Sequence, residues 1–131
     1  MTTTTNYAQQ YCATIAEELE NLNTVLDTDP QEDEYQDALA YLELEHVDNG
    51  DELVTYLNET VLEITKQHDD DGGPIGYVLL RTCGGPRCEI RRDTVNDGDN
   101  FYVDTWNGSE YFSLRVNLRA LAFNLDELLS Y

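Results

Sequence analysis

The sequence predicts an α+β fold, with helices and strands in separate parts of the chain. Three observations predict it. Apolar side chains recur at helical spacing through the first 72 residues, four short segments rich in β-branched and aromatic residues follow, and helical spacing returns at the end. Helices and strands that are segregated in this way do not form a parallel sheet. We therefore expect three N-terminal helices, a four-stranded antiparallel β-meander and a C-terminal helix.

A length of 131 residues is that of one ordinary domain. We expect a single domain over residues 1–131, with an acidic helical half (1–72) followed by the sheet and the last helix (73–131). The first helix is expected from about Tyr7 to Leu26, capped by Thr5 or Asn6. Its apolar stripe consists of Tyr11, Ile15, Leu19, Leu22 and Leu26.

Two further helices are expected before the sheet. Asp29-Pro30 places a capping residue before a proline, which predicts the start of a second helix that ends near His46. Residues 48–51 break this helix and cap a third. The inward side chains are Tyr35, Ala38, Leu39 and Leu42 in the second helix, and Leu53, Tyr56, Leu57, Val61 and Ile64 in the third.

The strand-forming segments come next, and turn residues separate them. Asn107-Gly108 predicts a two-residue hairpin turn between the last two strands. Asn117 is expected to cap the last helix. The expected strands are Ile75 to Thr82, Cys88 to Arg92, Phe101 to Trp106 and Glu110 to Val116, and the stripe of the last helix is Leu118, Leu121, Leu125, Leu128 and Leu129.

Charge is distributed very unevenly along the chain. Of the 27 carboxylates, 19 lie in residues 1–72 together with a single cation, Lys66, so this half carries about −18 of the net −20. Such a field repels nucleic acid and acidic membranes and attracts basic clefts. The chain lacks the ~18-residue apolar run of a membrane span. It begins without a signal peptide and its three cysteines are an odd number, so we expect a cytoplasmic protein with reduced thiols.

The densest acidic stretch is residues 27–52, with 11 carboxylates and no Lys or Arg. As a helix it would be about 39 Å long, with one charge every ~3.5 Å, close to the ~3.4 Å phosphate spacing of one B-DNA strand. A groove that binds phosphates would experience a similar potential here. Tyr41 or Tyr35 is expected to anchor the contact. The expected partner-binding residues are Asp29, Glu32, Asp33, Glu34, Asp37, Tyr41, Glu43, Glu45, Asp48, Asp51, Glu52, Glu59 and Glu63.

The acidity is also compatible with roles that involve no basic partner. Acidic helix faces commonly serve solubility alone. A salt-loving source would also favour many acids and a single lysine, and the chain would then be a structural or small-ligand-binding α+β domain. Against this, the C-terminal half is nearly neutral, whereas a salt-adapted surface should be acidic all round. A regulator of a virion or polymerase assembly is a third possibility.

Six of the seven cations are arginines that lie between Arg81 and Arg119, interspersed with Tyr77, Tyr102, Trp106 and Tyr111. Arginines beside aromatic rings are typical of nucleic-acid surfaces. However, this half has no net positive charge, which argues against direct nucleic-acid binding. We expect these arginines to pair with carboxylates of the helices packed on the sheet.

The residues that could carry chemistry form no complete site. Cys83 and Cys88 lack the two further ligands that zinc requires. The acids between Asp93 and Asp104 resemble a calcium loop only in part, because Val95 occupies a position that requires an oxygen ligand. Neither glycine-rich turn carries the lysine of a phosphate loop. We therefore expect a non-enzyme, without a cofactor or a metal.

A resemblance adds to this interpretation. The segment Thr82-Cys83-Gly84-Gly85-Pro86 is followed by Ile90, Asp93-Thr94, Trp106 near a glycine, and a Leu-Asp-Glu-Leu-Leu helix. Over roughly residues 75–131 this pattern resembles short acidic proteins of bacteriophages. The acidic composition of the N-terminal half is similar to anti-CRISPR and anti-restriction proteins that mimic DNA. The two likenesses imply a phage or mobile-element inhibitor that binds a basic complex of a host defence nuclease, in the host cytoplasm.

Overall fold

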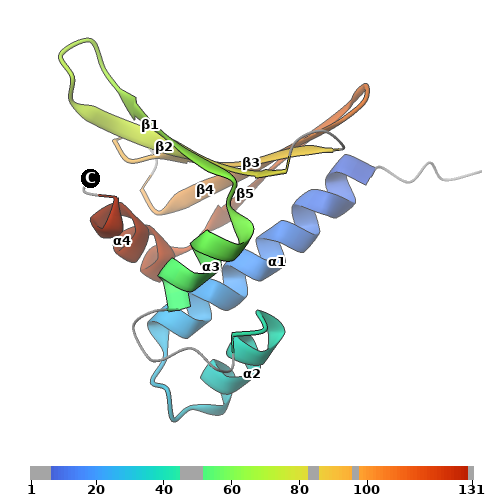
Figure 1. Cartoon of the computed structure of the whole chain (residues 1–131), viewed down its shortest axis with the longest axis vertical. Coiled ribbons are helices and arrows are strands. Elements are labelled where there is room, and N and C mark those ends of the chain that lie inside the picture. Colours follow the sequence, from blue (N-terminus) through green and yellow to red (C-terminus); the bar gives the residue numbers. More distant parts are fainter. Residues whose placement is uncertain (1–6, 45–51, 83–85, 96–97, 130–131) are drawn as a thin grey trace, which may run out of the picture.

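All four described helices lie on one face of a five-stranded sheet in the computed structural model of the chain (Figure 1). The structure describes residues 7–44, 52–82, 86–95 and 98–129. The elements are α1 (Tyr7–Asp27), α2 (Asp33–Tyr41), α3 (Glu52–Thr60), β1 (Glu63–His68), β2 (Pro74–Thr82), β3 (Arg87–Asp93), β4 (Asn100–Asn107), β5 (Glu110–Asn117) and α4 (Arg119–Leu128). The α+β class and the antiparallel sheet are confirmed.

The sheet is a meander in the order β1-β2-β3-β4-β5, so the expected number of four strands was wrong. Helix α3 ends at Thr60, and the next residues pair with β2 in the register Glu63↔Leu80 and Lys66↔Tyr77. Every residue of β1 is exposed. A strand with no buried side shows no alternation in its sequence, and Ile64 therefore extended the helical spacing of α3 instead.

Two boundaries of the C-terminal half also differ from the expected ones. The β4–β5 turn consists of Gly108 and Ser109, one residue later than expected, and Gly108 adopts a positive φ of 62°. The residue that caps α4 is Leu118, whereas Asn117 ends β5 and its side-chain amide donates to the Asn100 side-chain oxygen. Asn117 therefore belongs to strand β5, although it was expected to cap the last helix.

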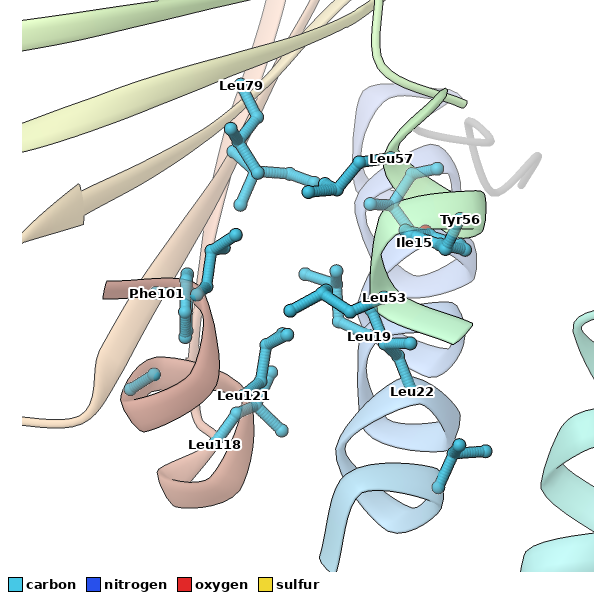
Figure 2. Packing of buried hydrophobic residues seen from close by; sticks show 14 of the residues in the cluster. Ile15, Leu19, Leu22, Leu53, Tyr56, Leu57, Leu79, Phe101, Leu118 and Leu121 are labelled. Carbon is cyan, nitrogen blue, oxygen red and sulfur yellow. The ribbon is translucent and has the colours of Figure 1, made fainter. Parts of the chain in front are cut away.

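The core lies between the sheet and helices α1, α3 and α4 (Figure 2). The fully buried side chains of the strands, such as Tyr77, Ile90 and Phe101, point toward this layer. Each such residue contributes roughly 1.5–3 kcal/mol on burial. The part of the cluster drawn in Figure 2 includes Ile15, Leu19 and Leu22 from α1, Leu53, Tyr56 and Leu57 from α3, Leu79 and Phe101 from the sheet, Leu118 from just before α4 and Leu121 from α4.

Two arginines join the sheet to the helices, as the sequence predicted for the group as a whole. Arg81 pairs with Glu18 of α1 at 3.2 Å. Arg92, only 4% exposed, makes a two-point contact with Asp126 of α4, at 2.7 Å from Nη2 and 3.1 Å from Nε. The other described ion pairs stay within the sheet and leave α2 without an arginine partner.

Loss of the Asp126 charge should destabilise the fold. Asp126→Asn leaves the buried Arg92 guanidinium without a countercharge, so we expect the free energy of unfolding to fall by about 3 kcal/mol. Urea titration followed by circular dichroism measures this. Glu127→Gln, on the exposed neighbour, is the matched control and should change stability by less than ~0.5 kcal/mol. Equal effects of both substitutions would contradict a buried ion pair.

Candidate functional site

Helices α1 and α2 form a helical hairpin, and the short segment of residues 28–32 joins them. Helix α2 buries Tyr35, Ala38 and Leu39, and it lies on the far side of α1 from the sheet (Figure 1). Asp29 does not cap α2 as expected. Instead, its side chain accepts a hydrogen bond from the Gln31 N–H at 2.9 Å within a turn. Because α2 packs on α1 through these three buried residues, its other side chains are exposed to solvent.

The exposed face of α2 is acidic. Asp33, Asp37 and Tyr41 follow one another at intervals of four residues on the side opposite the buried face, and all three are exposed. At ~1.5 Å per residue, the first two are about 6 Å apart along the axis. Glu34 lies beside them, also exposed. However, α2 has nine residues and is about 14 Å long, so the expected continuous 39 Å rod is not present.

Glu43 lies two residues after the end of α2, in a conformation that L-residues seldom adopt, with φ 60°. Its N–H donates to the Ala40 carbonyl, and the N–H of the buried Leu44 donates to the Leu39 carbonyl, each at 3.0 Å. These two bonds define a Schellman motif, in which glycine usually occupies the left-handed position. A carboxylate at the C-terminus of a helix is also disfavoured by the helix dipole. The chain thus has a carboxylate at a position where both the backbone conformation and the helix dipole make it unfavourable for stability.

The substitution Glu43→Gly should stabilise the protein. Glycine removes both the steric cost of the positive φ and the unfavourable charge, so we expect a gain of about 1 kcal/mol in the free energy of unfolding. Glu34→Gly is the same chemical change inside α2 and should cost about 1 kcal/mol. Chemical denaturation compares the two variants. A lower free energy of unfolding in Glu43→Gly would show that the backbone of Glu43 is not strained.

Tyr41 shows that the acids of α1 belong to the same surface. It is 44% exposed, and its pKa is raised by partial burial first and then by the charges of Glu17 and Glu18. Glu17 and Glu20 were not predicted as site residues, although both are exposed on α1. Only the packing of α2 on α1 reveals their contribution. We call the following set the acidic hairpin surface: Glu17, Glu20, Asp27, Asp29, Glu32, Asp33, Glu34, Asp37, Tyr41 and Glu43.

The acidic hairpin surface is not neutralised by the described part of the chain. Each of its nine carboxylate side chains is exposed. The four ion pairs among the described residues use Glu18, Glu89, Asp104 and Asp126 and none of the nine. The sequence places no Lys or Arg before Lys66. The negative potential of this surface is therefore open to a partner.

Glu52 was wrongly assigned to the exposed face. It is 3% exposed, and its carboxylate accepts a hydrogen bond from the Tyr35 hydroxyl at 2.5 Å. Burial raises the pKa of Tyr35 to about 12, and this hydrogen bond and the Glu52 charge act in the same direction. Tyr35 is itself 3% exposed, so it holds α2 against the start of α3 and cannot serve as the exposed anchor.

Two other expected site residues, Glu59 and Glu63, lie outside the acidic hairpin surface. Glu59 is exposed on α3. Glu63 pairs with Leu80, on the sheet face opposite the helices. Glu45, Asp48 and Asp51 lie outside the described residues.

The raised pKa of Tyr35 makes the free energy of unfolding decrease as the pH becomes alkaline. The unfolded chain releases this proton near pH 10, whereas the folded chain holds it to about 12, so stability falls as pH rises through this window. We expect Tyr35→Phe to remove a loss on the order of 2 kcal/mol between these limits. Denaturation curves at several pH values measure it. An undiminished loss in the variant would show that another group titrates.

The described residues hold no group of three His, Cys, Asp or Glu side chains that could bind a metal ion. Cys12 and Cys88 are buried, and burial raises the pKa of both thiols, that of Cys88 to about 11. Cys83 lies outside the described residues. The acidic hairpin surface supplies an array of exposed negative charge.

No family model, curated protein or solved structure matches the chain. None of the described helices combines the length and apolar character needed to cross a membrane.

Proposed function

We propose that the acidic hairpin surface binds a basic, nucleic-acid-binding protein by presenting carboxylates at positions where that protein binds phosphates. The observation that carries the proposal is the set of nine exposed carboxylates on two packed helices and on the residues that join and follow them. None of the nine forms an ion pair with a described residue. Binding would release counterions from both surfaces, as nucleic acid does. It would compete with nucleic acid and would require no catalytic turnover.

The two helices supply two rows of charge. Packed helices lie about 8–10 Å apart, so the carboxylates of α1 and α2 form a broad negative strip rather than a single line. Such a strip fits a groove whose Lys and Arg side chains approach from both walls. Tyr41 lies within the strip and is half-exposed, which suits an aromatic anchor surrounded by acids.

The partner class follows from the sequence resemblance to phage proteins. We propose that the partner is a host defence nuclease complex and that the chain acts as an anti-CRISPR or anti-restriction inhibitor. The strained Glu43 supports a binding role, because a carboxylate kept at a cost to stability is typical of functional surfaces.

Capture from a host lysate, followed by release with duplex DNA, tests the proposal. Replacing Asp33, Glu34, Asp37 and Glu43 by Asn and Gln should abolish capture. Stability should change little, because the loss of two favourable charges in the first turn of α2 is offset by the loss of an unfavourable one at its end.

A matched control separates mimicry from bulk charge. Asp70→Asn, Asp71→Asn, Asp99→Asn and Glu127→Gln remove the same number of charges outside the acidic hairpin surface. The control should retain most of the capture. Capture by the α2 variant at the native level, or equal loss in both variants, would refute recognition by the hairpin.

Salt adaptation is the second candidate. It is favoured by exposed acids outside the acidic hairpin surface, such as Asp70, Asp71 and Glu127, and by the single lysine of the chain. In that case the chain would be a structural or small-ligand-binding domain whose acids bind water and cations at high salt. It would then require molar salt to fold.

A further inference from the structure

We propose that the face of the sheet turned away from the helices is an interface between two copies of this chain. No described element covers this face (Figure 1). The strand registers place on it Glu63, Thr65 and Gln67 of β1, Gly76, Val78 and Leu80 of β2, Arg87, Glu89, Arg91 and Asp93 of β3, Tyr102, Asp104 and Trp106 of β4, and Tyr111, Ser113 and Arg115 of β5. We call this set the outer sheet face.

The centre of the outer sheet face is ordered by one buried carboxylate. Asp104 is 4% exposed and accepts hydrogen bonds from Arg91 Nε at 3.1 Å, the Tyr111 hydroxyl at 3.3 Å and the Ser113 hydroxyl at 2.5 Å. These donors come from the strands on both sides of β4. Their side chains are thereby fixed before any partner arrives, which lowers the entropy lost on binding.

Aromatic rings and arginines surround this carboxylate. The Arg91 guanidinium lies 4.5 Å from the centre of the Tyr102 ring, and the Trp106 and Tyr111 rings are 5.2 Å apart. Trp106 is 37% exposed and Tyr111 51%. Tyr, Trp and Arg are enriched in protein interfaces and lysine is depleted, and the outer sheet face contains no lysine. The composition is that of a protein contact rather than a solvated sheet.

Charge points to a second copy as the occupant. The outer sheet face carries three arginines, Arg87, Arg91 and Arg115, together with acids of the opposite sign. Its partly or fully exposed acids are Glu63, Glu89 and Asp93. A surface that carries both signs can meet a second copy of itself with opposite charges facing one another, as a two-fold contact requires. The acidic hairpin surface lies on the other layer, so two copies joined through their sheets hold these surfaces apart.

A two-fold axis perpendicular to the strands and level with Ile90 pairs opposite charges along β3. Sheets that pack face to face lie about 10 Å apart with strands nearly aligned. This axis places β3 of one copy over β3 of the other in the opposite direction, so that Arg87 faces Asp93 and Glu89 faces Arg91. The symmetry of the dimer makes each of these contacts twice.

The available area is sufficient. Five strands at the usual spacing and about seven residues in length span roughly 24 Å by 23 Å, or about 550 Å² per copy. The total of roughly 1,100 Å² is just above the ~1,000 Å² of the smallest specific interfaces. We therefore expect a reversible dimer with a dissociation constant on the order of 10 µM.

Sedimentation equilibrium of the full chain tests the proposal at concentrations up to ~100 µM. Trp106→Ala should weaken the dimer roughly tenfold or more. Phe123→Ala, which removes a 69% exposed ring on α4, is the matched control and should have no effect. A native chain that stays monomeric, or a dimer lost in the control and not in Trp106→Ala, would overturn the proposal.

Charge exchange tests the orientation. Arg87→Asp and Asp93→Arg should each weaken the dimer, and the double variant should restore it. A double variant no tighter than the single variants would refute the stated axis.

Salt separates this interface from the proposed function. Dimerisation should strengthen between about 0.05 and 0.5 M salt, because screening relieves repulsion between two chains of net charge −20. Binding of a basic partner to the acidic hairpin surface should weaken over the same range. A dimer that weakens with salt would contradict association through the outer sheet face. This result does not depend on whether a basic partner binds the acidic hairpin surface.

Discussion

The arrangement of the acidic layer depends on apolar packing that overcomes repulsion between like charges. Tyr35, Ala38 and Leu39 hold α2 against α1 although both helices carry acids and neither carries a cation. The Tyr35 hydroxyl adds a bond to Glu52 at the start of α3. Arg81 and Arg92 fasten α1 and α4 to the sheet and form no ion pair with the acids of α2. The fold thereby separates a negative helical surface from a sheet face of mixed charge.

Much of the fold follows from periodicity, and the exceptions have physical reasons. Helix α1 (Tyr7–Asp27) agrees closely with the expected range, because apolar side chains recur at helical spacing along it, whereas the expected caps Thr5 and Asn6 lie outside the described residues. Strands β2 to β5 were placed within one residue at each end. Strand β1 was not predicted, because it buries no side chain and its sequence shows no alternation. Ile64 instead fitted the helical spacing of α3. Helix α2 is shorter than expected at both ends, because Asp29 forms a turn of its own before it and the positive φ of Glu43 ends it early.

The candidate site was predictable only where local spacing decides exposure. The spacing of Tyr35 and Leu39 correctly placed Asp33 and Asp37 on the outer face of α2. The burial of Glu52 was not predictable, because its partner lies 17 residues earlier and meets it only through packing. Glu17 was missed for the same reason, since the hairpin between helices brings it beside α2. Long-range contacts therefore determined which acids form the surface.

The α1–α2 packing must withstand its own repulsion at ordinary salt if it is to present fixed carboxylates. The free energy of unfolding, measured in ~0.1 M and ~1 M salt at neutral pH, tests this most directly, because repulsion still acts at the ~10 Å screening length of the lower concentration. We expect a fully folded chain at ~0.1 M salt with a modest gain in stability at ~1 M. A chain that is unfolded at ~0.1 M salt and folds only near ~1 M would contradict this packing as the basis of the acidic hairpin surface.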